Sequence, residues 1–220
     1  THLQGPLAEM DGSWKPIVYC WRGGQRSGSF ASILQQIGWR ADIINGGYQS
    51  YRRLVSAMLH DDPLPHQQII LLDGNTGTGK TDLLHRLQLR GVQTVDLEGL
   101  ANHRGSLLGA HPDGQPAQKG FESRLASALT ACDPERPVVM EAESSKIGKL
   151  SLPPSLWAAM CAAPRIMISA PLAARASYLA AAYSDIAADM AALKARLAPL
   201  RRIRGHDVVG RWENLIATGQ

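Results

Sequence analysis

The stretch Ile69-Ile70-Leu71-Leu72-Asp73-Gly74-Asn75-Thr76-Gly77-Thr78-Gly79-Lys80-Thr81 joins an apolar run to a phosphate-binding pattern. Residues 74–81 match G-x-x-x-x-G-K-[ST] at every defined position, and an amphipathic segment begins at Asp82. A buried strand, a glycine-rich loop and a helix follow one another in this order in proteins that bind phosphate through the pattern. The stretch therefore predicts an α/β domain with a phosphate site where this strand ends.

The residues of this loop have separate tasks. Gly77 and Gly79 let the backbone turn tightly enough to point several N–H groups at phosphate oxygens. The helix that follows presents its positive end to the same anion. Lys80 adds an ammonium group, and the Thr81 hydroxyl can bind Mg²⁺ held between phosphates. The predicted phosphate-binding residues of the loop are Gly74, Asn75, Thr76, Gly77, Thr78, Gly79, Lys80 and Thr81.

Composition limits the class of protein. The chain has 220 residues, 45% of them hydrophobic and 5% aromatic, which suits an α/β protein of one large or two small domains. No apolar run approaches the roughly 20 residues of a membrane helix, and the amino terminus lacks the features of a signal peptide. We therefore expect no membrane partner. A formal charge of +4 permits an acidic partner such as RNA.

The three cysteines, Cys20, Cys132 and Cys161, are an odd number and lie far apart. They fit neither a disulfide framework nor a C-x-x-C metal site. We therefore expect a reducing, cytoplasmic location.

Cys20 is the second chemical signal. It ends a short β-prone run and precedes a glycine-rich loop and a predicted helix. Converging N–H groups and a helix dipole lower the pKa of a thiol in such a place and make it a nucleophile. Arg22 and Arg26 are expected to stabilise the thiolate and bind an oxyanion. The alternative is a structural cysteine on an ordinary strand–helix turn.

Two known chemistries share the spacing Cys-x5-Arg followed by Ser. Rhodanese-like sulfurtransferases carry a persulfide on such a cysteine. Cysteine phosphatases cradle a phosphate with Cys-x5-Arg, usually after a histidine. The loop is generally slightly shorter in the sulfurtransferases, and Tyr19 occupies the position of the histidine here, which weakens the phosphatase interpretation.

The regular elements alternate along the chain. We predict strands over 17–19, 41–44, 69–72, 92–97, 137–141 and 165–169. We predict helices over 29–37, 48–59, 82–89, 121–132, 155–161, 172–183 and 185–198, with irregular structure over 99–120. The apolar sides of two helices are expected to be Phe30, Ile33, Leu34 and Ile37 in one and Phe121, Leu125 and Leu129 in the other. The proline-bearing stretch 60–66 is the predicted domain boundary.

Acidic residues end two strands beside the phosphate loop. Asp96 and Glu98 close the predicted strand 92–97, where an acid can hold Mg²⁺ or a water. Glu141 ends the strand 137–141, as the metal-polarising acid of P-loop proteins does, with Glu143 as the alternative. Thr81 and Glu141 are thus the predicted ligands of a weakly held Mg²⁺, and no tightly bound cofactor is expected. Surface charge at strand ends is the competing interpretation.

Basic residues and a histidine complete the candidates. His103 and Arg104 lie in a loop at the carboxyl edge of the predicted sheet, where open α/β sheets bind ligands. His103 is a candidate general acid or base, or a solvated loop residue, and Arg104 a candidate phosphate contact. The basic carboxy-terminal segment predicts RNA contacts through Arg201, Arg202 and Arg204, with a solvated helix face as the alternative.

Taken in this order, the motifs resemble the tRNA 2-selenouridine synthases, in which a rhodanese-like domain precedes a P-loop domain. The resemblance is carried by the stretches 19–27, 45–52, 74–81, 96–106, 121–122 and 141–148. The stretch Asp96-Leu-Glu-Gly-Leu-Ala-Asn-His-Arg-Gly-Ser106 is especially specific. Beyond residue 150 the likeness rests on the order of elements and on Arg175.

The resemblance implies a partial rhodanese-like parallel sheet over residues 1–60, followed by a P-loop NTPase-like parallel α/β domain over 67–220. A complete rhodanese domain has further strands and helices before its cysteine strand, whereas 19 residues precede Cys20, so we expect a truncated first domain.

The family's activity would make the chain a transferase acting on the wobble 2-thiouridine of tRNA. Geranyl diphosphate alkylates the sulfur, and selenium from selenophosphate then displaces the S-geranyl group. The residues expected to serve catalysis are Cys20, Arg22, Arg26, Asp96 and His103, with Cys20 carrying or receiving selenium or sulfur.

Two other functions stay open. One is a P-loop nucleotide kinase or NTPase with a rhodanese-like appendage, and the other is a nonenzymatic fragment that binds tRNA or phosphate. The chain lacks the Asn-Lys-x-Asp guanine signature, which argues against a GTPase. The sequence does not define which donor the loop binds, whether ATP is used, or the oligomeric state.

Overall fold

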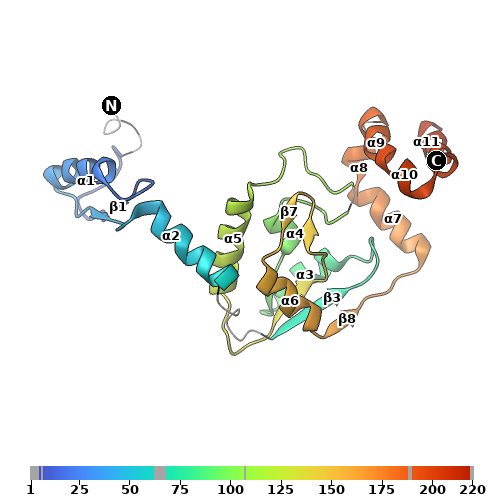
Figure 1. Ribbon diagram of the computed structural model, residues 1–220, viewed down its shortest axis with the longest axis horizontal. Helices are drawn as coiled ribbons and strands as arrows, with labels where there is room; N and C mark the ends of the chain where they lie inside the picture. Colours follow the sequence, from blue (N-terminus) through green and yellow to red (C-terminus); the bar gives the residue numbers. More distant parts are fainter. Residues whose placement is uncertain (1–4, 6, 62–67, 107, 188–189, 219–220) are drawn as a thin grey trace. The chain divides into compact units, whose positions relative to one another are not determined.

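A computed structural model describes residues 5, 7–61, 68–106, 108–187 and 190–218 (Figure 1). The chain divides into two compact units, Thr1–Asp62 and Pro63–Gln220. Of the stretch predicted as the domain boundary, the described residues include His60 and Asp61, and 62–66 lie outside them. No described helix combines the length and the apolar character that a membrane crossing requires.

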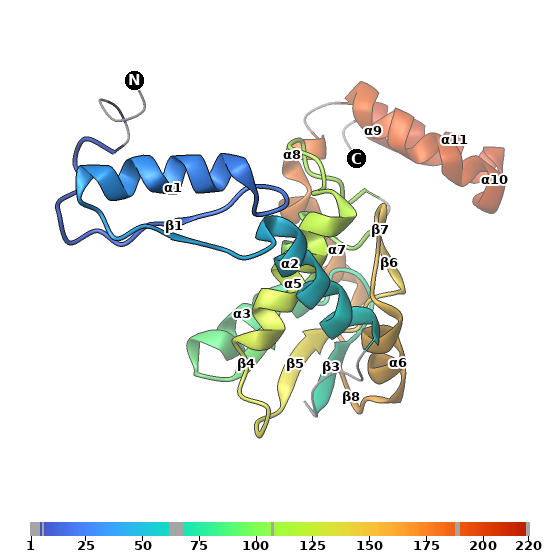
Figure 2. The same cartoon turned by 60° about the vertical axis from the view of Figure 1, so that its left-hand side comes forward.

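The first unit contains a two-stranded parallel sheet of β1 (Ile17–Val18) and β2 (Asp42–Ile43). Helix α1 (Gln25–Ile37) connects the two strands and runs alongside them (Figure 2). Helix α2 (Gly47–Ser56) follows and continues into a π-helical turn, Ala57–Asp61. A small core forms around Ala31, Leu34 and Ala41. Because parallel strands alternate with helices, this unit has the α/β character that was predicted.

The buried face of α1 differs from the predicted one. Leu34 is buried as expected, but Ile33 and Ile37 are 46% and 47% exposed. The buried positions are instead Ser27, Ala31 and Leu34. Two short strands cover only a narrow stripe of the helix, and the small side chain of Ala31 lets that stripe approach the sheet closely.

The second unit is built on a four-stranded parallel sheet with the order β4-β5-β3-β8. Its strands are β3 (Ile69–Asp73), β4 (Gln93–Val95), β5 (Val138–Glu141) and β8 (Arg165–Met167). All three pairings are parallel, and Leu71 of β3 lies opposite Met140 of β5 and Arg165 of β8. Every residue of β5 is buried, because strands inside a parallel sheet are covered on both faces. The predicted α/β class is confirmed.

Helices α3 (Lys80–Leu89), α5 (Gln118–Thr130) and α6 (Pro154–Ala162) belong to the same unit. Leu84 of α3 packs in one cluster with Leu72 of β3 and Val139 of β5. The predicted apolar side of α5 is confirmed, since Phe121, Leu125 and Leu129 are buried. The core thus holds the helix after the phosphate loop firmly against the sheet.

A short helix and a hairpin near the phosphate loop were not predicted. The strand expected over 92–97 ends at Val95, because Asp96 begins the short helix α4 (Leu97–Leu100) and caps it. A small antiparallel hairpin follows β5, formed by β6 (Lys146–Ile147) and β7 (Leu150–Ser151). Gly148 turns this hairpin with a φ of 59°, a value that favours glycine.

The carboxy-terminal segment from Leu172 is mostly helical in its described part (Figure 1, orange to red). It comprises α7 (Leu172–Ala182), α8 (Ser184–Ala187), α9 (Met190–Leu197), a 3-10 turn (Ala198–Leu200), α10 (Arg201–Arg204) and α11 (His206–Ala217). The helix predicted over 185–198 therefore corresponds to parts of α8 and α9, and its residues 188 and 189 lie outside the described ones. Helix α11 was not predicted.

Candidate functional site

The phosphate loop, Gly74–Thr81, leaves β3 and enters α3 directly. Gly77 and Gly79 have φ values of 87° and 75°, in the left-handed region that favours glycine. A Cβ atom on Gly77 would lie 2.9 Å from both the Arg175 carbonyl oxygen and Leu179 Cγ of α7. Glycine is therefore required at 77 both for the turn and for the close approach of α7.

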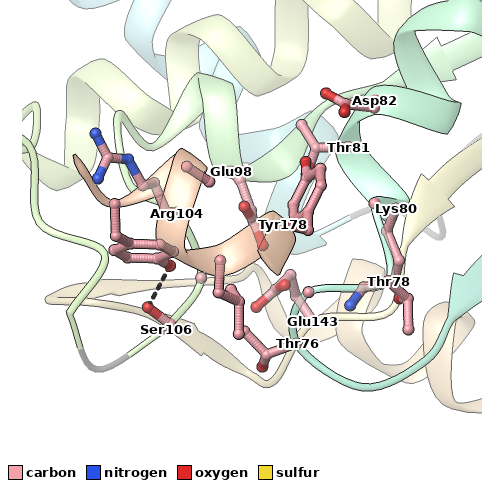
Figure 3. Close-up of a pocket in the computed structure, with 16 residues that line it drawn as sticks. Thr76, Thr78, Lys80, Thr81, Asp82, Glu98, Arg104, Ser106, Glu143 and Tyr178 are labelled. Atoms are coloured by element: carbon pink, nitrogen blue, oxygen red, sulfur yellow. Dashed lines mark hydrogen bonds between the residues drawn. The ribbon is translucent and has the colours of Figure 1, made fainter. Parts of the chain in front are cut away.

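A cavity of about 240 Å³ opens at this loop (Figure 3). Its described lining comes from the loop, from the segment around α4 and from α7. The lining residues are Thr76–Asp82, Glu98, Arg104, Gly105, Ser106, Glu143, Tyr178, Leu179, Ala182 and Tyr183. Gly74 and Asn75, which were also predicted to bind phosphate, are not among them, and they shape the loop through hydrogen bonds from Lys80 and Thr78 to their carbonyl oxygens.

Two basic side chains hold the loop. Lys80 Nζ donates a hydrogen bond of 2.8 Å to the carbonyl oxygen of Gly74. Arg175 Nε of α7 donates one of 3.0 Å to the carbonyl oxygen of Thr76. The contact from Arg175 joins α7 to the loop. The Lys80 ammonium lines the cavity at the predicted anion site.

The predicted pair Thr81 and Glu141 is in direct contact. Thr81 Oγ1 donates a hydrogen bond of 2.5 Å to Glu141 Oε1 at the end of β5. Glu141 is fully buried, and its Oε2 has no hydrogen-bond partner among the described residues. Burial raises the pKa of Glu141 to about 7, and the negative charges of Asp96 and Glu143 act in the same direction.

This pair fits a magnesium ion. Hydroxyl and carboxylate oxygens are the ligands that Mg²⁺ prefers, and Glu141 Oε2 is an acceptor without a donor. Within the described residues no group of three or more His, Cys, Asp or Glu side chains is placed to hold a metal. Mg²⁺ usually keeps several waters and binds phosphate oxygens, so one or two protein ligands are sufficient.

Glu98 of α4 and Glu143 of the segment after β5 lie beside one another in the wall of the cavity (Figure 3). Burial raises the pKa of Glu98 to about 9, with a further contribution from its hydrogen bond to Glu143. A Cβ atom on Gly105 would collide with both carboxyl groups, so glycine keeps room for the pair. At neutral pH the Glu98 carboxyl group therefore keeps its proton.

The raised pKa of Glu98 predicts how stability depends on pH. Between about pH 4.5 and 9 the folded state keeps a proton that the unfolded state has released, so the free energy of unfolding falls as the pH rises. The variant Glu98→Gln is neutral at every pH and escapes this loss. We expect its gain in unfolding free energy to be larger at pH 8 than at pH 5 by about 2 kcal/mol, measured by denaturant titration. The exposed Glu135→Gln is the matched control, and an equal gain at both pH values would contradict the assignment.

Asp96 and His103, both predicted to serve catalysis, lie outside the described lining of the cavity. Asp96 caps α4 by accepting a hydrogen bond from the Gly99 N–H at 2.7 Å, and it contacts His85 Nε2 at 2.9 Å. His103 is buried, its pKa is lowered by that burial, and its Nδ1 has no hydrogen-bond partner among the described residues. These contacts favour a structural role for Asp96 in holding α4, in place of direct contact with a substrate.

Arg104 does line the cavity, as its predicted phosphate contact requires. Its guanidinium lies 5.0 Å from the centre of the Tyr183 ring, within the range of a cation–π contact. Tyr183 in turn shares a hydrogen bond of 2.6 Å with Ser106 Oγ. This chain of contacts joins the loop after α4 to the end of α7.

The cysteine site forms separately in the first unit. Cys20 Sγ accepts hydrogen bonds from the Gly24 N–H at 3.3 Å and from Ser27 Oγ at 3.4 Å. These two donors, Ser27 first, lower the pKa of Cys20 to about 6. Arg22 and Arg26 line a cavity of about 450 Å³ together with the cysteine, so the three predicted residues are neighbours.

This geometry predicts the reactivity of Cys20. A pKa of about 6 makes the thiolate the main form at pH 7, so the alkylation rate should rise with pH to a midpoint near 6. The variant Ser27→Ala removes the largest cause, and its midpoint should move up toward the ordinary value of 9.0. Iodoacetamide labelling followed by mass spectrometry of the Cys20 peptide measures both. The same midpoint in the variant and the parent protein would refute the role of Ser27.

The predicted RNA contacts lie together on α10, where their environments differ. Arg201 Nη2 lies 2.8 Å from each carboxylate oxygen of Glu213 in α11. Arg202 and Arg204 are exposed. All three side chains are accessible in part, since that of Arg201 is 40% exposed, but Arg201 also joins two helices through its ion pair.

Sequence reasoning missed the contribution of α7. Tyr178, Leu179, Ala182 and Tyr183 line the cavity, although the sequence predicted only a helix over 172–183 and no site residue in it. Two tyrosines five residues apart in a segment composed mostly of alanine were the available signal. Arg175, to which the family resemblance beyond residue 150 also points, contacts the phosphate loop.

Comparisons with known proteins point to one family. The family model described as the tRNA 2-selenouridine synthase AAA domain matches residues 67–201. Proteins named tRNA 2-selenouridine synthase are similar to the chain: that of Aeromonas salmonicida is 37% identical over 80% of this chain and 47% of its own length. That of Shewanella loihica is 38% identical over 79% and 46%, and that of Hahella chejuensis 40% over 73% and 42%. The chain thus spans about half the length of the curated relatives it matches. No solved structure matches it significantly.

Proposed function

Because the chain belongs to the tRNA 2-selenouridine synthase family, we propose that it acts in the conversion of 2-thiouridine to 2-selenouridine at the wobble position of tRNA. The observation that carries the proposal is the phosphate-loop cavity, which Lys80, Thr81 and Arg104 line. Both donors that the family resemblance implies, geranyl diphosphate and selenophosphate, are phosphorylated. A site that holds a phosphorylated donor can therefore serve this chemistry without hydrolysis of ATP.

In the first proposed step the sulfur of 2-thiouridine attacks C1 of geranyl diphosphate. The new S–C1 bond forms as the C1–O bond breaks, and the diphosphate leaves with the electron pair. Negative charge grows on the leaving group, so fixed N–H dipoles and cations aimed at it lower the barrier. The loop amides, Lys80 and Arg104 supply these groups.

Magnesium would strengthen the same effect when bound. Thr81 and Glu141 would hold it, and the ion would neutralise charge on the diphosphate. Glu141 must ionise to take this part, and its pKa of about 7 puts that ionisation within reach at neutral pH. Glu98 keeps its proton at neutral pH and therefore adds no negative charge to the cavity, which limits the repulsion of the diphosphate.

In the second proposed step selenium from selenophosphate replaces the S-geranyl group at C2 of the base. We assign the displacement to Cys20, which has the lowered pKa of a nucleophile. Its thiolate attacks C2 and the C2–S bond to the geranyl sulfur breaks, so geranylthiolate leaves. The selenium of selenophosphate then attacks C2 and displaces the Cys20 thiolate, and hydrolysis of the Se–P bond releases phosphate. Arg22 and Arg26 border the same cavity and would bind the oxyanion of the donor. The exposed Arg202 and Arg204 would contact tRNA phosphates, an interaction that weakens with salt.

One observation also favours a second candidate, a P-loop kinase or NTPase. The contact between Thr81 and Glu141 is equally suited to a magnesium nucleotide. The deciding experiment incubates the protein with 2-thiouridine tRNA, geranyl diphosphate and selenophosphate, and analyses the wobble nucleoside by mass spectrometry. S-geranyl-2-thiouridine or 2-selenouridine supports the proposal. Turnover of ATP with an unchanged tRNA would replace it by the nucleotide enzyme.

A further inference from the structure

A second cavity adjoins the one at the phosphate loop. Its volume is about 430 Å³, within the roughly 300–1,000 Å³ typical of small-molecule sites. The two cavities share part of their lining, namely Thr76, Ser106, Leu179 and Tyr183. Because the shared residues belong to both walls, a single ligand can extend from one cavity into the other.

The wall of this second cavity is aliphatic. Its remaining side chains come largely from the carboxy-terminal helices and include Ala180, Ile186, Leu193, Leu197 and Leu200. Of the described residues that line it, none carries a charge. Ile186 and Leu197 are buried beneath it, at 6% and 8% exposure. A ligand group gains free energy here in proportion to the apolar surface that it buries.

The polar groups of this cavity lie where it meets the phosphate loop. Ser106 Oγ and the Tyr183 hydroxyl share a hydrogen bond of 2.6 Å, so each is partnered without a ligand. Thr76 belongs to the loop itself. The lining thus changes from anion-binding to apolar over the width of α7. A ligand that fills both cavities must therefore have an anionic group at one end and an apolar group at the other.

We propose that this apolar cavity binds the hydrocarbon chain of a prenyl diphosphate whose diphosphate lies in the phosphate loop, and that its walls set the accepted chain length. This inference rests on the proposed function and assigns residues to its first donor. A nucleotide fits the pair of cavities less well, since a base buried without hydrogen-bond partners would pay for its desolvation. The chain carbon bonded to the diphosphate would lie near Leu179, which approaches Gly77 closely.

The variant Ala180→Trp tests the proposal by filling the cavity from α7. Ala180 is exposed and its substitution needs no repacking of the core. We expect the affinity for geranyl diphosphate, measured by calorimetry, to fall at least about tenfold, since buried apolar surface is lost. The affinity for inorganic diphosphate should stay within about twofold. Ala181→Trp is the matched control, because Ala181 is exposed on the same helix and lines neither cavity.

A second variant tests the length of the chain. Leu193→Ala enlarges the cavity at a half-buried position, so the 15-carbon farnesyl diphosphate should gain affinity relative to the ten-carbon geranyl diphosphate by about fivefold or more. An unchanged ratio in Leu193→Ala, or equal loss for geranyl and inorganic diphosphate in a folded Ala180→Trp protein, would overturn the assignment. Circular dichroism establishes that each variant is folded.

The outcomes separate this inference from the proposed function. If the parent protein binds inorganic diphosphate as tightly as geranyl diphosphate, the apolar subsite is refuted and the phosphate site stands. If it binds neither, both the phosphate donor site and the inference fail. If geranyl diphosphate binds more tightly and both variants behave as expected, the cavity is the prenyl subsite.

Discussion

The Lys80→Ala variant is expected to lose binding of geranyl diphosphate and geranylation of 2-thiouridine tRNA, with kcat/KM reduced at least about 100-fold. Lys80 lines the cavity at the phosphate loop and donates to the Gly74 carbonyl oxygen at 2.8 Å. Its removal takes a cation away from the place where charge develops on the leaving diphosphate. The same substitution also frees the loop carbonyl. Initial rates of geranylation and calorimetric titration with geranyl diphosphate measure the two effects.

The matched control is Lys119→Ala, since Lys119 is an exposed lysine of α5 outside the described lining of the cavity. Its rates should stay near those of the parent protein. If Lys80→Ala keeps its affinity for both inorganic and geranyl diphosphate while it is folded, the phosphate loop is not the donor site. The proposed first step would then need another location.

The Cys20→Ser variant is expected to give no selenation above background while geranylation stays within about twofold of the parent rate. The thiolate, with a pKa of about 6, is the form of Cys20 present at pH 7, whereas a serine hydroxyl does not ionise there. The described residues that line the phosphate-loop cavity all belong to the second unit. The variant should therefore separate the two steps, and S-geranyl-2-thiouridine should accumulate.

Mass spectrometry of the wobble nucleoside follows both products in one sample. Cys161→Ser is the control, because Cys161 is an exposed cysteine of α6 outside the described linings of both the phosphate-loop and the cysteine cavity. Selenation at the parent rate in Cys20→Ser would remove the cysteine from the mechanism. The assignment of the phosphate loop would be unaffected by that result.

Contiguous motifs were the most predictable part of the molecule. The loop at Gly74–Thr81 follows a strand and begins a helix as its sequence indicates, because its geometry depends on neighbours in the chain. The same holds for Cys20, whose partners Gly24 and Ser27 are four and seven residues away. Helical periodicity likewise identified Phe121, Leu125 and Leu129 as buried.

Faces and boundaries that depend on distant elements were less predictable. The periodicity of α1 was correct, yet Ile33 and Ile37 are exposed because the small sheet covers another stripe of the helix. The strand predicted over 92–97 was too long. Val95 ends β4 and Leu97 begins α4, and both residue types occur in strands and at helix ends. Asp96 decides between them by capping α4, and a cap requires the fold of the following turn.

The sequence by itself determined the strand–loop–helix order around the two loops, and it predicted an anion site at Gly74–Thr81 and a nucleophilic thiol at Cys20. Tertiary structure alone decided which groups share a cavity with the phosphate loop. It brings Glu98 to Glu143, and Ser106 to Tyr183, which is 77 residues away. It also lays α7 against Gly77 and sets an aliphatic cavity beside the phosphate loop. The physical reason is range: turns, caps and helix ends act between near neighbours, whereas the packing of helices on a parallel sheet joins residues that no local pattern links.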